Sequence, residues 1–262
     1  MSRINETFNR LKTDGKKGFI PFITAGDPNL QTTGRLIVEL AHSGASIIEL
    51  GVPFSDPMAD GPVIQRASER ALRYGFGLKE IFSVTAEACA VVDTPIVLFS
   101  YFNPLLQYGV NKLVLEAKQS GIDAILVTDL IPEEAGDFAA ALRQNELDMI
   151  FLIAPTSTDA RLQLVAERAS GFIYAISRAG VTGSQESVSK AAEHLVMRMR
   201  KYSSLPIAVG FGISSATQVR EVWRFADAAV VGSAIVSEIE KEARSPQLVK
   251  NIGRFARSLT MD

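Results

Sequence analysis

Eight short, apolar, β-rich runs recur along the chain, and each is followed by a segment with helical periodicity. Most of the runs are continuously apolar, as expected for strands that are buried on both faces of a parallel sheet. The runs are GFIPFIT from Gly18, SIIELGV from Ser46, PIVLFSY from Pro95, DAILVT from Asp123, DMIFLIA from Asp148, GFIYAIS from Gly171, LPIAVGF from Leu205 and DAAVVGS from Asp227. Eight strands alternating with helices over 262 residues predict an α/β fold, a (β/α)₈ TIM barrel, as a single domain spanning residues 1–262.

Helical patterns fill the rest of the chain. An additional helix is expected before the first strand, because Ile4, Phe8 and Leu11 fall on one face. The widest gap, between the second and third strands, fits two helices, Pro62 to Tyr74 and Leu78 to Val92. No linker interrupts the series, which favours one domain. An open, doubly wound sheet shows the same alternation and is the alternative, although no G-x-G-x-x-G motif follows the first strand.

Composition and charge narrow the class of protein. The 27 Lys and Arg residues nearly balance 29 Asp and Glu residues, which argues against a nucleic-acid binder. The single cysteine, Cys89, excludes an internal disulfide, and the 2 histidines, His42 and His194, are too few for a multi-histidine metal centre. No apolar run reaches the ~18 residues of a membrane span, and the first residues lack the apolar core of a signal peptide. We therefore expect a soluble, cytoplasmic protein with no metal, no nucleic-acid partner and no membrane segment.

The carboxyl ends of the strands are where a barrel of this kind carries its chemistry. No lysine and neither histidine occurs in the segments that end the eight strands, which disfavours Schiff-base and zinc-dependent aldolase mechanisms. Carboxylates remain, and they indicate proton transfer. They are Glu49, Asp56, Asp60 and Asp129.

Glu49 stands within an apolar strand, between Ile48 and Leu50. A barrel interior would raise its pKa toward that of a general acid that later acts as a base. The competing interpretation makes Glu49 a structural residue that pairs with an arginine. Asp60 follows in a loop rich in proline and glycine and could reach the same substrate, although Ala-Asp-Gly-Pro is equally good turn chemistry.

Glycines gather after the last strands. Gly210-Phe211-Gly212-Ile213-Ser214 begins within the end of the seventh run, and Gly232-Ser233-Ala234 begins within the end of the eighth. Each segment opens a helix, where free backbone N–H groups and the helix dipole attract an anion such as phosphate. Gly183, after the sixth strand, could close over the same phosphate. Glycine at strand-to-helix turns also occurs for steric reasons alone.

Three motifs carry a resemblance to a known family: FIPFITAGDP from Phe19, ELGVPFSDPMADGPVIQ from Glu49 and SRAGVTG from Ser177. Together they resemble the tryptophan synthase α-subunit family, and the resemblance covers essentially the whole chain. It implies a lyase that cleaves indole-3-glycerol phosphate to indole and glyceraldehyde 3-phosphate by a metal-free retro-aldol reaction, with no cofactor.

The resemblance also implies residue roles. The glutamate of ELG, here Glu49, is the family's general acid and base, and the aspartate of ADGP, here Asp60, holds the indole N–H and stabilises the positive charge that develops there. Thr182 is the expected contact to Asp60 when the loop after the sixth strand, Arg178 to about Ser189, closes. The other expected substrate contacts are Tyr174 beside the glutamate, Phe22, Ile64, Phe99 and Leu126 near the indole pocket, and Gly183, Gly212, Gly232 and Ser233 at the phosphate.

A partner is implied as well, the β subunit of an α₂β₂ complex, which receives the indole. The loop Pro53 to Asp60 contacts that subunit in the family. The segment Ser100 to Tyr108 is expected to expose aromatic side chains on the same surface. The alternatives are a stand-alone lyase that releases indole and an inactive barrel kept as a binding subunit; intact Glu49 and Asp60 argue against the latter.

Three remaining features are structural or local. Cys89 and Trp223 are expected to be packed helix residues. The segment Asp129-Leu130-Ile131-Pro132-Glu133-Glu134 departs from the family's Asp-Leu-Pro-x-Glu-Glu, because its proline lies one place later. This departure leaves the expected chemistry unaffected and the shape of the loop open.

Overall fold

The computed structural model describes residues 2–176, 190–210 and 212–261, in which eight parallel strands close into a barrel. The strands pair in chain order, and the last pairs with the first in the register Gly18↔Ala228. This closure confirms the predicted barrel and rules out the open sheet. The strands are β1 (Gly18–Thr24), β2 (Ile48–Gly51), β3 (Ile96–Ser100), β4 (Ile122–Val127), β5 (Asp148–Ile153), β6 (Ile173–Ile176), β7 (Ile207–Gly210) and β8 (Ala228–Val231).

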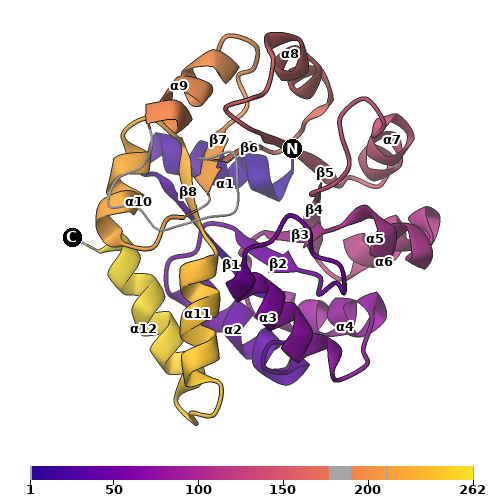
Figure 1. The fold of residues 1–262 in the computed structure, drawn as a ribbon, viewed down its shortest axis with the longest axis vertical. Coiled ribbons are helices and arrows are strands. Elements are labelled where there is room, and N and C mark those ends of the chain that lie inside the picture. The colour runs from indigo at the N-terminus through magenta and orange to yellow at the C-terminus, as the bar shows by residue number, and fades with distance from the viewer. Residues whose placement is uncertain (1, 177–189, 211, 262) are drawn as a thin grey trace.

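Helices form the outer layer (Figure 1). The two helices predicted between the second and third strands are present as α3 and α4, each ending a few residues earlier than expected. The helices are α1 (Arg3–Thr13), α2 (Leu30–His42), α3 (Pro62–Leu72), α4 (Leu78–Cys89), α5 (Phe102–Tyr108), α6 (Val110–Gln119), α7 (Gly136–Gln144), α8 (Asp159–Arg168), α9 (Lys190–Met199), α10 (Ala216–Trp223), α11 (Ser233–Glu242) and α12 (Leu248–Thr260). None of the helices in the described ranges has the length and hydropathy that crossing a membrane requires.

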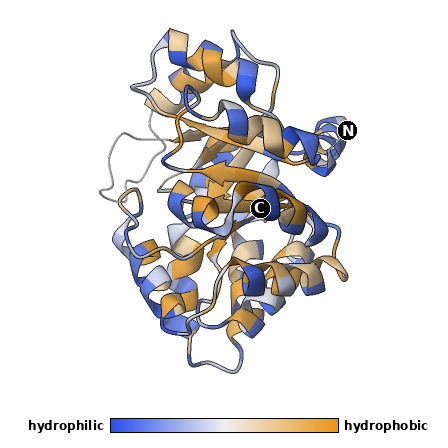
Figure 2. Cartoon of the chain, turned by 90° about the vertical axis from the view of Figure 1, so that its right-hand side faces the viewer, coloured by the Kyte–Doolittle hydropathy of each residue, from blue (hydrophilic) through white to orange (hydrophobic). Residues whose placement is uncertain are grey.

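The apolar residues form two layers of core. Figure 2 shows hydrophobic strands in the middle of the molecule and helices whose hydrophilic residues face outward. The larger cluster lies between the outer faces of the strands and the surrounding helices, and includes Leu36, Ile48 and Leu98. The second cluster fills the barrel interior and includes strand residues that point inward, such as Ile20 and Val97.

Helix α1 closes the N-terminal end of this interior. Ser2 caps the helix by accepting a hydrogen bond from the Asn5 N–H, at 3.3 Å. Ile4 and Phe8 are buried in the interior cluster, and the Phe8 ring lies 5.8 Å from that of Phe172. The amphipathic pattern at the start of the sequence therefore serves the barrel, as a plug for its floor.

The two expected structural residues behave as such. The indole Nε1 of Trp223, at the end of α10, donates a hydrogen bond to the Gly18 carbonyl at 2.8 Å and so ties the helix to β1. Cys89 is the last residue of α4 and is partly buried against Gly121, where an added Cβ would meet its sulfur at 2.9 Å.

Candidate functional site

The Glu49 carboxyl group lies inside the barrel. Its strand neighbours in register are Phe22 in β1 and Val97 in β3, and Glu49 is 1% exposed. Among the described residues, its Oε1 atom has no hydrogen-bond partner. No arginine in these ranges forms the ion pair with Glu49 that the structural interpretation of the sequence requires. Burial raises the pKa of Glu49 to about 8, so the group is protonated at neutral pH. This is the state that a general acid requires.

Tyr174 lies beside Glu49 in the interior. It is 4% exposed, in β6, and pairs in register with Ala208 of β7. Burial raises the pKa of the Tyr174 hydroxyl well above its ordinary value, and the charge on Glu49 raises it further. Gly210 leaves the space that the tyrosine ring occupies, because an added Cβ there would lie 2.6 Å from Tyr174 Cζ. The structure thus brings together the two residues that the sequence places 125 positions apart.

Asp60 is held at the mouth of the barrel by a residue that sequence reasoning did not assign to the site. Tyr101, directly after β3, donates its hydroxyl proton to Asp60 Oδ2 at 3.2 Å, and the same hydroxyl accepts from the Ala59 N–H at 2.9 Å. Gln65 of α3 donates to the Asp60 carbonyl at 2.9 Å. Burial raises the pKa of Asp60 to about 6, and the Tyr101 hydrogen bond acts against that rise. The one sequence feature that could have pointed to Tyr101 as a site residue is its position at the carboxyl end of the predicted third strand.

The predicted pocket residues form a continuous apolar wall. Phe22 and Phe99 pack edge to face with ring centroids 5.3 Å apart, and Ile64 of α3 packs on the same cluster. Phe99 also contacts the interior cluster that contains Leu126 and Tyr174. The wall therefore extends from the rim, near Asp60, to the buried carboxyl group.

Of the predicted phosphate residues that the structure describes, Gly232 lies next to this wall. Gly232 is the N-cap residue of α11 and has no side chain that could cap the helix. The first N–H groups of α11 therefore receive no hydrogen bond from an N-cap side chain. An added Cβ at Gly232 would lie 3.6 Å from Phe22 Cβ, which places the helix start against the apolar wall. Gly212 has φ +81°, a conformation that favours glycine. Ser233 begins α11, whereas Thr182 and Gly183 lie outside the described residues.

The other strand-end carboxylates bind backbone or neighbouring groups, although the charge of Asp129 is near enough to Tyr101 to help raise the pKa of its hydroxyl, after burial and Asp60. Asp129 Oδ1 accepts a hydrogen bond from the Phe102 N–H at 2.7 Å and so caps the start of α5. Asp56 is exposed and accepts from the neighbouring Ser55 hydroxyl at 2.5 Å. Pro132, in the segment that departs from the family pattern, accepts a hydrogen bond from Arg168 through its carbonyl. These groups shape loops.

The aromatic segment after β3 differs from expectation. Tyr101 is 6% exposed and packs on Phe54, with ring centroids 5.0 Å apart, instead of facing solvent. The rings of Phe102 and Tyr108 pack on neighbouring helices, edge to face. The expectation of exposed aromatic side chains is therefore wrong for Tyr101, because the Asp60 loop covers it.

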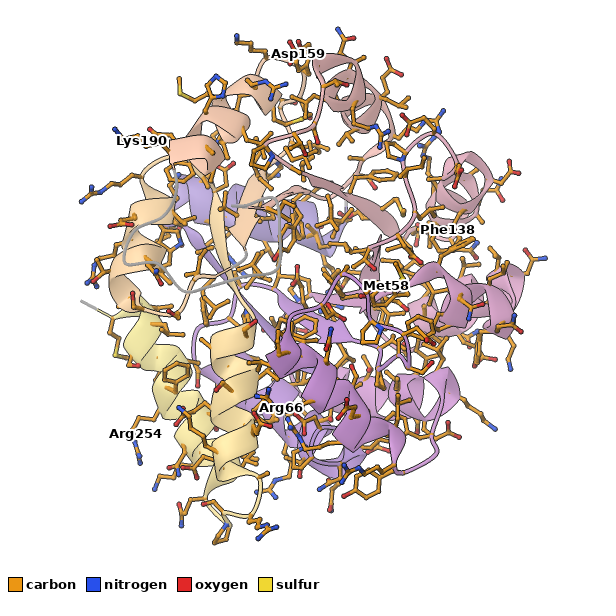
Figure 3. All side chains as sticks on the ribbon, in the orientation of Figure 1. Met58, Arg66, Phe138, Asp159, Lys190 and Arg254 are labelled. Carbon is orange, nitrogen blue, oxygen red and sulfur yellow. The ribbon has the colours of Figure 1, made fainter. Side chains whose placement is uncertain are left out.

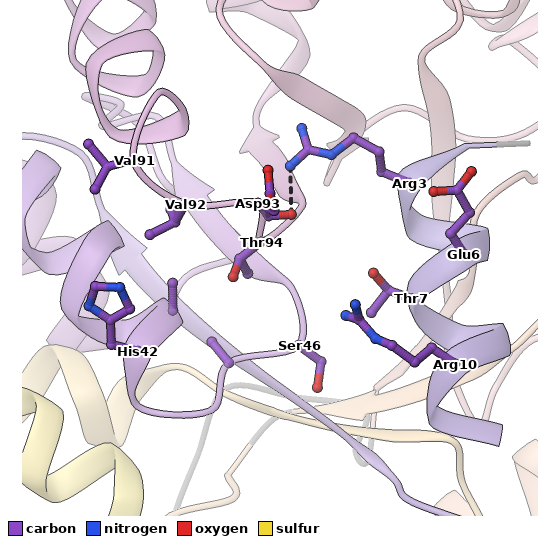
Figure 4. Close-up of a pocket in the computed structure, with 12 residues that line it drawn as sticks. Arg3, Glu6, Thr7, Arg10, His42, Ser46, Val91, Val92, Asp93 and Thr94 are labelled. Carbon is purple, nitrogen blue, oxygen red and sulfur yellow. Dashed lines mark hydrogen bonds between the residues drawn. The ribbon is translucent and has the colours of Figure 1, made fainter. Parts of the chain in front are cut away.

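A cavity of about 650 Å³ lies at the opposite, N-terminal end of the barrel (Figure 4). It contains none of the predicted site residues, and Arg3 spans part of it by donating to the Asp93 carbonyl at 2.7 Å. Its lining residues are Arg3, Glu6, Thr7, Arg10, Ala41, His42, Ala45, Ser46, Val91, Val92, Asp93 and Thr94. The candidate site is instead at the C-terminal mouth of the barrel, where the apolar wall of Phe22, Phe99 and Ile64 links the loop of Asp60 to the interior that holds Glu49 and Tyr174.

A closed eight-stranded barrel with carboxyl groups at one mouth defines the class of (β/α)₈-barrel enzymes. Comparison with known proteins specifies it further. The sequence profile of the tryptophan synthase alpha chain family matches residues 8–260. The tryptophan synthase alpha chain of Geotalea uraniireducens (strain Rf4) is 47% identical over 259 residues, which cover 99% of this chain and 97% of that relative. The chain belongs to the tryptophan synthase alpha chain family.

Solved structures agree with this assignment. The tryptophan synthase subunit alpha of Legionella pneumophila str. Paris superposes with a TM-score of 0.91 at 34% identity, covering 99% of this chain and 97% of that one. A structure of tryptophan synthase from M. tuberculosis in its aminoacrylate-bound form gives a TM-score of 0.87 at 34% identity, covering 99% and 100%. The function is accordingly that of the α subunit, a lyase that cleaves indole-3-glycerol phosphate to indole and glyceraldehyde 3-phosphate in L-tryptophan biosynthesis.

Proposed function

We propose that Glu49 performs the proton transfers of this cleavage. The observation that carries the proposal is a carboxyl group that is 1% exposed, has no partner for its Oε1 atom within the described part of the chain and has a pKa raised to about 8 by burial. Such a group holds a proton at neutral pH and can deliver it to a carbon atom. Its apolar surroundings disfavour the ionised form, so the carboxylate that remains after the proton is given up readily takes a proton back.

The steps balance with one carboxyl group and no added reactant. Protonated Glu49 transfers its proton to the indole ring carbon that bears the side chain, which places a positive charge on the ring nitrogen. The resulting carboxylate takes the proton of the adjacent side-chain hydroxyl. The carbon–carbon bond then breaks, its electron pair restores the aromatic indole, and the hydroxyl-bearing carbon becomes the aldehyde of glyceraldehyde 3-phosphate.

Asp60 is the proposed partner of the ring nitrogen. Its pKa of about 6 makes it ionised at neutral pH, so it can accept a hydrogen bond from the indole N–H and stabilise the positive charge that forms in the first step. The Tyr101 hydroxyl and the Gln65 amide hold the residue in place. Because these bonds exist before substrate arrives, little reorganisation is needed when the charge develops.

The remaining predicted residues bind the two ends of the substrate. Phe22, Ile64, Phe99 and Leu126 are proposed to contact the indole ring, and Tyr174 to pack beside Glu49. The N–H groups at the start of α11, with Gly232 and Ser233, and the Gly212 turn are proposed to bind the phosphate, as helix N-termini do. Thr182 and Gly183 are proposed to complete the site from the loop after β6. Anchoring the phosphate positions the reacting carbon at Glu49.

We also propose that the chain works in the cytoplasm as the α subunit of an α₂β₂ complex. The loop between β2 and α3 supports the β-subunit partner, because Met58 is 89% exposed next to Asp60. Methionine is among the residues that are enriched at protein interfaces. A partner that covers this loop would act directly on the residue that stabilises the charge. Indole could then pass to the partner instead of entering solvent.

The test is indole release from indole-3-glycerol phosphate by the purified chain, with and without a purified β subunit. We expect slow release that increases strongly with β, and a Glu49→Gln variant that is inactive in both conditions. Fast release that β leaves unchanged would indicate the stand-alone lyase. An active Glu49→Gln variant would overturn the proposed role of Glu49.

A further inference from the structure

The TAGDP motif at the end of β1 contributes a carboxylate that the proposed chemistry does not use. Asp27 is 1% exposed, and both of its carboxylate oxygens accept hydrogen bonds from Arg70 of α3, from Nε and from Nη2, each at 2.8 Å. The third nitrogen of Arg70, Nη1, donates to Glu240 Oε1 of α11 at 2.6 Å. Glu240 also accepts from Arg66, at 2.8 and 2.7 Å. We call these four residues the Arg70 cluster.

The cluster joins three elements that surround the candidate site. Asp27 belongs to the segment after β1, the two arginines belong to α3, and Glu240 belongs to α11. Figure 1 shows α3 and α11 lying side by side, and Figure 3 shows Arg66 between them. A guanidinium group suits this junction, because its planar fork can bind one carboxylate with two bonds and still reach another.

The two helices begin at the two ends of the proposed substrate site. Pro62, the first residue of α3, follows Asp60 by two positions, and Ser233 is the first residue of α11. Arg70 and Glu240 lie about 12 Å and about 10 Å further along their helices, at 1.5 Å per residue. Between these points Ala67 and Val236, both 0% exposed, pack on Phe22.

We infer that Arg70 is a positioning residue that fixes Asp60 relative to the phosphate-binding start of α11. Apolar packing alone allows the helices to slide, whereas directed bonds to both Asp27 and Glu240 define one position of α3. The Gln65–Asp60 hydrogen bond transmits that position to the loop. This inference rests on the proposed function, since it assigns Arg70 a role through Asp60.

The test is a double-mutant cycle with Arg70→Lys and Asp60→Asn. Lysine keeps the positive charge, so Asp27 is not left as an unpaired buried charge, but a single ammonium cannot reproduce the fork. We expect Arg70→Lys to lower kcat about tenfold, as a small misplacement of a catalytic group does. The Kd for glycerol 3-phosphate, which reports the proposed phosphate end of the site and does not involve Asp60, should stay within about twofold. In the Asp60→Asn background, Arg70→Lys should change kcat by less than about twofold.

Arg257→Lys is the matched control. Arg257 of α12 also joins two helices, through Glu39 of α2 at 3.2 Å, and within the described ranges its guanidinium group donates to Glu39 and Ser43 and to none of the site residues. It should leave kcat unchanged. If Arg70→Lys lowers kcat by the same factor with and without Asp60, or not at all, the positioning role is wrong. If Asp60→Asn alone leaves kcat unchanged, the proposed function of Asp60 fails, and the inference fails with it.

Discussion

Gly210 in β7 lies against the ring of Tyr174 in β6, so closely that a Cβ atom added to the glycine would fall 2.6 Å from the tyrosine Cζ. Side chains essentially never approach so closely, and the backbone of β7 cannot retreat without disturbing its register with β6. The glycine therefore determines where the tyrosine beside Glu49 can lie. The glycine-rich segment after β7 thus begins with a residue that serves packing.

Gly210→Ala is expected to displace Tyr174 and with it the surroundings of Glu49. We expect a loss of about 1–3 kcal/mol in the free energy of unfolding, typical of an overpacked core, and an indole release rate about tenfold lower. Gly136→Ala is the control, because an added Cβ at Gly136 meets no atom within 4 Å. Urea unfolding and indole release would be measured for both. Equal behaviour of the two variants would contradict the packing role.

Glu49→Gln should increase stability at high pH while removing activity. Burial raises the pKa of Glu49 from 4.5 to about 8, so between these values the folded chain binds more protons than the unfolded chain. The free energy of unfolding should therefore fall as pH rises through this range, and glutamine removes this loss. We expect the variant to match the parent near pH 4.5 and to exceed it by a few kcal/mol above about pH 8. Unfolding midpoints at several pH values test this, and parallel curves for the two proteins would contradict it.

Tyr101→Phe should move the acidic limb of the pH–rate profile. In the proposed mechanism activity requires ionised Asp60, so kcat/KM should rise with pH through its pKa of about 6. Loss of the Tyr101 hydrogen bond, which favours the carboxylate, raises that pKa and shifts the limb to higher pH. Tyr108→Phe is the matched control, because the Tyr108 hydroxyl donates to Glu116, away from the site. A limb that stays in place in Tyr101→Phe would show that Asp60 does not govern it.

Ser233→Asp should have opposite effects on stability and on substrate binding. A carboxylate in the first turn of α11 interacts favourably with the helix dipole, by about 0.3–1 kcal/mol, and would repel a substrate phosphate bound at the proposed position. We therefore expect KM for indole-3-glycerol phosphate to rise more than about tenfold while the unfolding midpoint stays equal or increases. Thr158→Asp, at the capping position of α8, carries the same charge to a different helix and should leave KM unchanged. An unchanged KM in Ser233→Asp would place the phosphate elsewhere.

Much of the fold could be predicted because its determinants are local. The run GFIPFIT coincides with β1, since a strand buried on both faces is apolar at every position. The same argument placed Glu49 in the interior, because its neighbours in the strand are all buried. The strand starts are less exact: β2, β6 and β7 each begin two residues after the start of the predicted run. At the sixth run the reason is Gly171, whose φ of +74° is incompatible with a strand, so that β6 begins at Ile173.

The contacts that hold the site together could not be predicted. Tyr101 lies 41 residues from Asp60, and Arg70 lies 43 residues from Asp27. Both pairs depend on how the segment from Asp60 through α3 packs over the ends of β1 and β3. The residues next to each partner in the sequence do not specify that packing. Tyr101 was interpreted as a surface residue for this reason. An aromatic residue beside prolines looks the same whether a loop covers it or not.

The placement of Ile4 and Phe8 limits the route by which substrate can enter and products can leave. With these side chains filling the N-terminal end of the barrel, a compound that reaches Glu49 has to come in over the carboxyl ends of the strands. Both products of the cleavage have to leave through the same end of the barrel. With a single entrance, any group that covers the carboxyl ends of the strands controls the order in which the two products leave.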